Sequence, residues 1–165
     1  MTAAAAVLAA GGEVTVPALN EYELPLYHGD LEDGTGLRAN TVKLIEQIKG
    51  HDGLLAAAPE CNLFITPRLK NTLDWCTWGE EDPFGGRAAA VVPAAPGAYG
   101  GIRSLQHARQ LLLHLGCHVV PSQGSLPRAH EAFDETGALK DERTGSAVEA
   151  VAVDAVRLAT RLAKE

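Results

Sequence analysis

Residues 53–75, GLLAAAPECNLFITPRLKNTLDW, decide the fold of this chain. The first six, Gly53–Ala58, form a short apolar run that ends at a proline, which is typical of a strand buried on both faces. From Pro67 onward the apolar residues recur at helical spacing, i, i+4 and i+7: Leu69, Leu73 and Cys76. Thr66 can cap this helix, and Pro67 suits its first position because no amide donor is lost there. The segment is therefore predicted as strand, loop and helix.

The rest of the chain alternates strands and helices in the same way. Three further strands are predicted from apolar alternation or continuous apolar runs: Glu13–Val16 at an edge, Ala88–Val92 in the interior and Cys117–Pro121 at an edge. Helical spacing predicts three further helices: Leu37–Lys49, Ile102–Leu115 and Ser146–Ala163. The alanine content of Thr2–Ala10 and the two glycines that follow predict a fourth, and one helical turn is expected at Arg128–Phe133. A long polar loop is expected over Asn20–Gly36. This order predicts an α/β protein with a parallel sheet.

Composition limits the partners. At 165 residues the chain has the size of a single domain, residues 1–165. Its net charge of -7 argues against nucleic acid and anionic membranes as partners, because their phosphates would be repelled. No apolar run reaches the roughly 20 residues of a membrane span, and the Ala-rich start lacks a basic leader segment, so a cytoplasmic location is expected. The three cysteines show no disulfide or zinc spacing, and the six histidines suggest no metal site.

Topology points to two loops as candidate ligand sites. In open parallel sheets, ligands bind where loops leave the carboxyl ends of the strands. One such loop begins at Pro59, and the other is a glycine-rich loop over Pro93–Gly101 that leads into a strongly amphipathic helix. Glycine lets the backbone amides approach a flat ligand closely, since no Cβ intervenes. Paired glycines before a helix can also be a simple turn, but their placement favours a site.

Three motifs carry a resemblance to a known family. Pro59-Glu60-x-Asn62, followed after six residues by Leu69-Lys70-Asn71 and Asp74-Trp75, resembles the P-E-Y-N-x6-L-K-N-x-x-D-W signature of NADPH-dependent FMN reductases. Gly97–Arg103 resembles the G-x-x-G-G-x-R loop of that family, and Phe133–Leu139 its F-D-E-x-G-x-L segment. The family includes quinone, azo-dye and chromate reductases. The resemblance extends from about Val14 to the carboxyl terminus.

The resemblance implies a fold, cofactors and a function. The fold would be a flavodoxin-like three-layer α/β/α sandwich with a parallel sheet of strand order 2-1-3-4-5. The cofactors would be FMN and NADPH or NADH, with two electrons passed to a quinone, an azo compound, a metal oxyanion or free flavin. A homodimer or homotetramer is expected through the helix that follows Pro59–Asn62. No catalytic side chain and no metal ligand is implied, since the chemistry belongs to the flavin.

The resemblance also assigns cofactor-binding residues. The backbone of one loop would line one edge of the isoalloxazine ring: Pro59, Glu60, Cys61 and Asn62. The second loop would approach the other edge: Gly97, Tyr99, Gly100 and Gly101. Asp74 and Trp75 are expected to be structural. Cys61 stands where the family usually has tyrosine, and Leu63-Phe64 replaces a smaller pair, which makes the loop bulkier and more apolar. An inert Cys61 thiol is favoured, because no basic residue adjoins it.

The start of the sequence departs from the family pattern. Family members open with an apolar strand and a G-S-x-R-x-x-S-type loop that holds the FMN phosphate, whereas this sequence begins in the helix that would follow. The true start could lie upstream, Glu13–Pro17 could pair directly beside the Gly53 strand, or a partner chain could fill the gap. Two other functions therefore stay open: a non-catalytic flavodoxin-like subunit that has lost FMN, and a one-electron carrier.

Overall fold

A parallel sheet of three strands forms the middle layer of the computed structural model, which describes residues 2–164. Strand β4 (Ala88–Val92) lies between β1 (Gly53–Ala57) and β5 (His118–Val119), and both pairings are parallel. Leu55 of β1 lies opposite Ala90 of β4 in the register of the sheet. The three strands therefore end at the same edge, and the loops that leave them lie side by side there.

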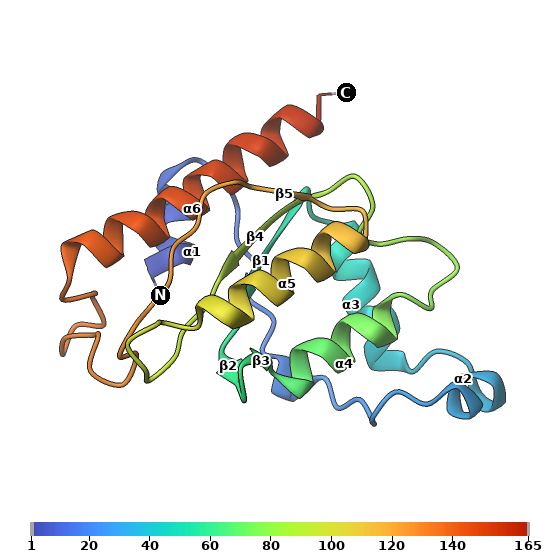
Figure 1. The fold of residues 1–165 in the computed structure, drawn as a ribbon. Coiled ribbons are helices and arrows are strands. Elements are labelled where there is room, and N and C mark those ends of the chain that lie inside the picture. The colour runs from blue at the N-terminus through green and yellow to red at the C-terminus, as the bar shows by residue number, and fades with distance from the viewer. Residues whose placement is uncertain (1, 165) are drawn as a thin grey trace.

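Helices cover both faces of the sheet, which confirms the predicted α/β/α layers (Figure 1). Helix α6 (Glu142–Leu162) packs on one face together with α1 (Thr2–Ala9), and α5 (Ile102–His114) packs on the other. Helices α3 (Ala39–Lys49) and α4 (Pro67–Cys76) lie against each other beside α5. The remaining short elements complete the chain: the 3-10 turn η1 (Leu19–Glu21), α2 (Gly29–Thr35), β2 (Glu60–Cys61) and β3 (Phe64–Ile65).

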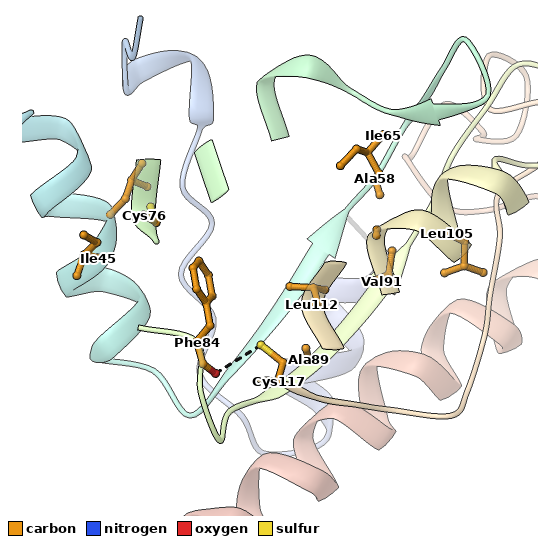
Figure 2. Packing of buried hydrophobic residues seen from close by; sticks show 12 residues of the cluster. Ile45, Ala58, Ile65, Cys76, Phe84, Ala89, Val91, Leu105, Leu112 and Cys117 are labelled. Atoms are coloured by element: carbon orange, nitrogen blue, oxygen red, sulfur yellow. Dashed lines mark hydrogen bonds between the residues drawn. The ribbon is translucent and has the colours of Figure 1, made fainter. Parts of the chain in front are cut away.

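Alternation along β4 explains how one strand supports both layers. Ala89 and Val91 belong to the core cluster that also contains residues of α5, whereas Ala90 belongs to the cluster that contains Val151 of α6. Successive side chains of a strand point to opposite faces, so β4 contributes side chains to both cores. Figure 2 shows the larger of these cores, in which the thiol of Cys117 also contacts the carbonyl oxygen of Phe84 at 3.5 Å.

Several sequence expectations need correction. Residues 13–16 are not a strand, because no neighbouring strand lies beside them in the described part of the chain. For the same reason the outer edge of β1 is unpaired within residues 2–164, and β1 is half-buried instead of buried on both faces. The expected loop over 20–36 contains α2, and residues 128–133 form turns without a helix. Helix α6 begins earlier than predicted, at Glu142, because Asp141 caps it by accepting a hydrogen bond from the Thr144 amide at 2.8 Å.

The helix of the family signature, α4, holds a distant loop in place. Thr66 caps it as expected, with its hydroxyl 3.4 Å from the Leu69 amide. The Asn71 side chain accepts a hydrogen bond from the Tyr27 amide at 2.7 Å and donates one to the Pro25 carbonyl at 2.9 Å. The buried Trp75 indole also donates to the Pro25 carbonyl, at 2.8 Å. Lys70 and Asp74 form an ion pair along the helix at 2.5 Å. These signature residues are therefore structural, as expected for Asp74 and Trp75.

We expect Asn71→Ala to lower the free energy of unfolding by about 1 to 2 kcal/mol, because two hydrogen bonds to the 25–27 backbone are lost together. Lys70→Ala is the matched control on the same helix, and it should cost about 0.5 kcal/mol or less, because an exposed i,i+4 ion pair contributes little. Urea unfolding followed by tryptophan fluorescence measures both. Equal losses in the two variants would contradict the role of Asn71 in holding the 25–27 backbone against α4.

Candidate functional site

The two predicted ligand loops meet at the carboxyl ends of β1 and β4. The amide of Ala58 donates to the carbonyl of Val92 at 3.1 Å, and the amide of Glu60 donates to the carbonyl of Ala94 at 3.2 Å. The pairing of the two strands therefore continues into their loops. As a result, the segment that begins at Pro59 and the glycine-rich segment lie next to each other, as topology predicted.

The first loop is a small hairpin, which the sequence did not predict. Strands β2 and β3 pair antiparallel, with Glu60 opposite Ile65 and Cys61 opposite Phe64. The two turn residues have positive φ angles, 48° for Asn62 and 68° for Leu63. Such turns suit the twist of a hairpin, and asparagine followed by glycine is the usual pair. Leucine at the second position carries a strain of about 1 kcal/mol, because its Cβ crowds the following carbonyl.

Glu60 joins the hairpin to the start of α5. Its carboxylate accepts hydrogen bonds from the backbone amides of Arg103 at 3.2 Å and Ser104 at 3.4 Å, and it pairs with the Arg103 guanidinium at 3.4 Å. The residue at the cap position of α5 is Gly101, which has no side chain to accept these bonds. Only 12% of the Glu60 side chain is exposed. A carboxylate is favourable there because the helix dipole is positive at that end.

Ser104 completes this connection from the helix side. It is fully buried, and its hydroxyl donates to the carbonyl of Ala58 at 2.7 Å. Glu60 was predicted to contribute through its backbone. The structure shows that its side chain has a separate role, which is to fix the position of the hairpin. Ser104 was missed by the sequence analysis, since a serine inside an amphipathic helix gives no distinct signal.

The second loop needs glycine for steric reasons. Gly100 and Gly101 have φ angles of 59° and 82°, where other residues are strained. A Cβ on Gly100 would lie 2.8 Å from the backbone nitrogen of Pro127, and one on Gly101 would lie 2.9 Å from Cβ of Pro93. A Cβ on Gly97 would meet nothing within 4 Å. The paired glycines therefore close the loop, while Gly97 faces open space.

A third segment borders the glycine-rich loop and was not predicted to take part. Leu126 pairs with Ala94 as a parallel bridge, and the Arg128 amide donates to the carbonyl of Gly97 at 3.2 Å. Tyr99 projects outward with 70% of its surface exposed, and the Arg103 guanidinium lies 5.3 Å from its ring centre. Loops from all three strands thus gather at one edge of the sheet. The sequence signal for this third segment was its position shortly after the strand predicted at Cys117–Pro121.

The arrangement leaves hydrogen-bond donors available. Within residues 2–164, the backbone amides of Asn62, Gly97, Ala98 and Tyr99 have no acceptor. Backbone donors next to open space suit a flat ligand with oxygen and nitrogen acceptors along its edges. A hollow of about 290 Å³ borders the third segment at Leu126 and Arg128, and one of about 630 Å³ lies between α1 and α6, but the predicted site residues line neither of them. The two loops present an open surface.

The cysteines divide by burial. Burial raises the pKa of the Cys76 thiol to about 12 and that of the Cys117 thiol to about 11, whereas Cys61 is exposed on the hairpin.

Among residues 2–164, no three histidine, cysteine, aspartate or glutamate side chains come together in a way that could hold a metal ion. No helix in that range is both long and apolar enough to cross a bilayer.

We expect Glu60→Gln to lower the free energy of unfolding by about 1 kcal/mol, because a neutral amide accepts weakly at a helix start. Glu131→Gln is the control. Glu131 is exposed and faces Arg128 at 3.9 Å, so its loss should change stability by less than about 0.5 kcal/mol. Chemical denaturation measures both variants, and a Glu60→Gln protein as stable as the control would refute the capping role.

We expect Ellman's reagent at pH 8 to modify one thiol per folded chain, that of Cys61. The other two thiols stay protonated and covered in the folded state, so they should react only after denaturant is added. A Cys61→Ser variant gives the control, with no fast-reacting thiol. Rapid reaction of two or three thiols in the folded protein would contradict the burial of Cys76 and Cys117.

Comparison with known proteins gives the family. The family model described as NADPH-dependent FMN reductase matches residues 1–131. An NAD(P)H-dependent FMN reductase of Pseudomonas aeruginosa is 36% identical over 121 residues, which cover 73% of this chain and 65% of that protein. A quinone reductase of Escherichia coli K12 is 33% identical over 98 residues, covering 59% of this chain and 52% of that protein. The chain thus spans between about half and two thirds of the length of these relatives.

A solved structure supports the fold. The FerB flavoenzyme NAD(P)H:(acceptor) oxidoreductase of Paracoccus denitrificans superposes with a TM-score of 0.81, covering 98% of this chain and 87% of that protein at 24% identity. Similarity at that identity shows the fold alone, which is flavodoxin-like as the sequence predicted. Because the family model matches well over half of the chain, this protein belongs to the NADPH-dependent FMN reductase family.

Proposed function

We propose that this chain binds FMN between its two loops and works as an NAD(P)H-dependent reductase of small-molecule acceptors. The observation that carries the proposal is a set of backbone amides without an acceptor within residues 2–164, in exposed residues at the carboxyl edge of the sheet: Asn62, Gly97, Ala98 and Tyr99. The names of the relatives, FMN reductase and quinone reductase, support the same chemistry.

The residues fit the ring of the cofactor. The hairpin backbone from Pro59 to Asn62 would lie along one edge of the ring, and the backbone from Gly97 to Gly101 along the other. Hydrogen bonds donated by these backbone amides would hold the ring in place. They would also stabilise the negative charge that the ring gains on reduction, since fixed backbone dipoles do so without reorganising. The exposed Tyr99 ring beside Arg103 would shield one side of the ring from water.

The phosphate of FMN has no comparable cradle in the described residues, which lack the G-S-x-R loop of the family. The ring contacts therefore carry the proposal. The chemistry that FMN would supply when bound is two-electron transfer: the hydride of reduced nicotinamide provides two electrons and one proton, and a second proton from water completes the reduction of a quinone to the hydroquinone. The chain's own task is to bind, orient and shield.

Finer points of the proposal follow from the family resemblance. Azo compounds, metal oxyanions and free flavin are further acceptors to be tested, with NADPH and NADH as alternative donors. We also propose that residues 1–165 act as one domain, that two or four copies associate through α4, and that the protein works in the cytoplasm. Size-exclusion chromatography with light scattering tests the association directly.

The deciding experiment is a titration of the 165-residue chain with FMN, followed by quenching of flavin fluorescence. We expect saturable binding at micromolar concentrations. Riboflavin should bind within about threefold of FMN, because the ring provides the contacts. The loaded chain should then oxidise NADPH when a quinone is present. A folded chain that binds neither flavin would refute the reductase proposal and favour a non-catalytic flavodoxin-like subunit.

A matched pair of variants locates the site. Gly97→Leu should fold normally, because a side chain there meets open space, yet it should weaken FMN binding by at least about tenfold by occupying the position of the ring. Gly34→Leu makes the same change at another glycine in open space and should leave FMN affinity unchanged. Equal affinity in the two variants would show that the ring lies elsewhere.

A further inference from the structure

The tip of the β2–β3 hairpin combines backbone strain with an exposed apolar side chain. Leu63 has a φ of 68°, and 58% of its surface is exposed. Backbone strain of this kind persists where the surrounding structure enforces it, and strained residues are common at functional sites. Glycine would remove the strain at this turn. Most of the leucine surface faces solvent, so packing against the fold offsets little of this strain.

Contacts on both strands hold the hairpin that carries Leu63 against the rest of the fold. The Glu60 carboxylate fixes its first strand to the amides at the start of α5. On its second strand, the Phe64 ring lies 4.3 Å from the His107 ring of the same helix. Ile65 is buried in the main core. Leu63 is therefore presented in a defined position, one residue beyond the predicted cofactor contact at Asn62.

The hairpin around Leu63 exposes no unpaired charge. The exposed residues beside Leu63 are Cys61, Asn62 and Phe64, and none of them carries a charge. The acidic residue of the hairpin is Glu60, whose carboxylate accepts hydrogen bonds from α5 amides and pairs with the Arg103 guanidinium, so its charge is compensated. The chain as a whole carries a net charge of -7. Anionic molecules are repelled from such a protein, and the hairpin offers them no compensating cation.

We propose that Leu63 is a specificity-determining residue that contacts the electron acceptor and selects uncharged, apolar, planar molecules of the quinone type over anionic acceptors. This inference rests on the proposed function, because it assumes that reduction takes place between the two loops. The leucine side chain covers the apolar face of the acceptor, and the strained turn keeps it outside the core where the acceptor can reach it.

The test compares two acceptors in Leu63→Asn, because asparagine tolerates the positive φ and removes the apolar surface. We expect kcat/KM for menadione to fall by about five- to tenfold, mainly through KM, because an apolar contact with the substrate is lost. The rate with ferricyanide, an anion that gains nothing from leucine, should stay within about twofold. Leu113→Asn is the control, since Leu113 is 56% exposed on α5, and it should change neither rate.

A binding measurement separates this inference from the proposed function. Menadione titrated into the isotopically labelled chain without NADPH should shift the amide signals of Leu63 and Phe64, and Leu63→Asn should weaken that saturable change. The inference is overturned if those signals do not move, or if Leu63→Asn slows both acceptors equally. Shifts at Leu63 in a chain that neither binds FMN nor turns over would retain the contact and overturn the reductase proposal alone.

Discussion

The contact between the Glu60 carboxylate and the first amides of α5 is the interaction on which the candidate site depends. It spans 43 positions in the sequence, and it brings the loop after β1 to the loop after β4. Gly101 must adopt a positive φ to start α5, so it leaves the helix without a cap of its own. The carboxylate from the other loop supplies that cap. The positive φ of Gly101 in the second loop therefore leaves the α5 amides without a local cap, and the Glu60 carboxylate of the first loop provides one.

The family signature divides into two physical tasks. Its first part, at Pro59–Asn62, belongs to the loop edge, where the Asn62 amide has no acceptor within residues 2–164. Its second part acts within the fold, because Asn71 and Trp75 both donate to the carbonyl of Pro25. A carbonyl oxygen has two lone pairs, and both are used here. Part of this motif therefore lies at the candidate site, and the rest of it stabilises the fold.

The sequence predicted the layers and the adjacent loops because both follow from periodicity and from the order of elements. It could not predict the β2–β3 hairpin, since a two-residue turn with leucine at a positive φ breaks the usual turn chemistry. The edge strand expected at 13–16 was wrong because alternation indicates a strand only where a neighbour exists to pair with it. The roles of the Glu60 side chain and Ser104 depend on contacts over 43 or more positions, which no local pattern encodes.

The run of alanines in β4 has a consequence for how the protein can change. Ala88, Ala89 and Ala90 are completely buried, and Ala89 and Ala90 belong to cores on opposite faces of the sheet. There is no spare volume, so a larger side chain would push α5 or α6 outward. A displaced α5 would carry its first turn away from the Glu60 carboxylate. Sequence diversity directed at new acceptors is therefore best confined to the hairpin tip and the glycine-rich loop, with the central strand left untouched.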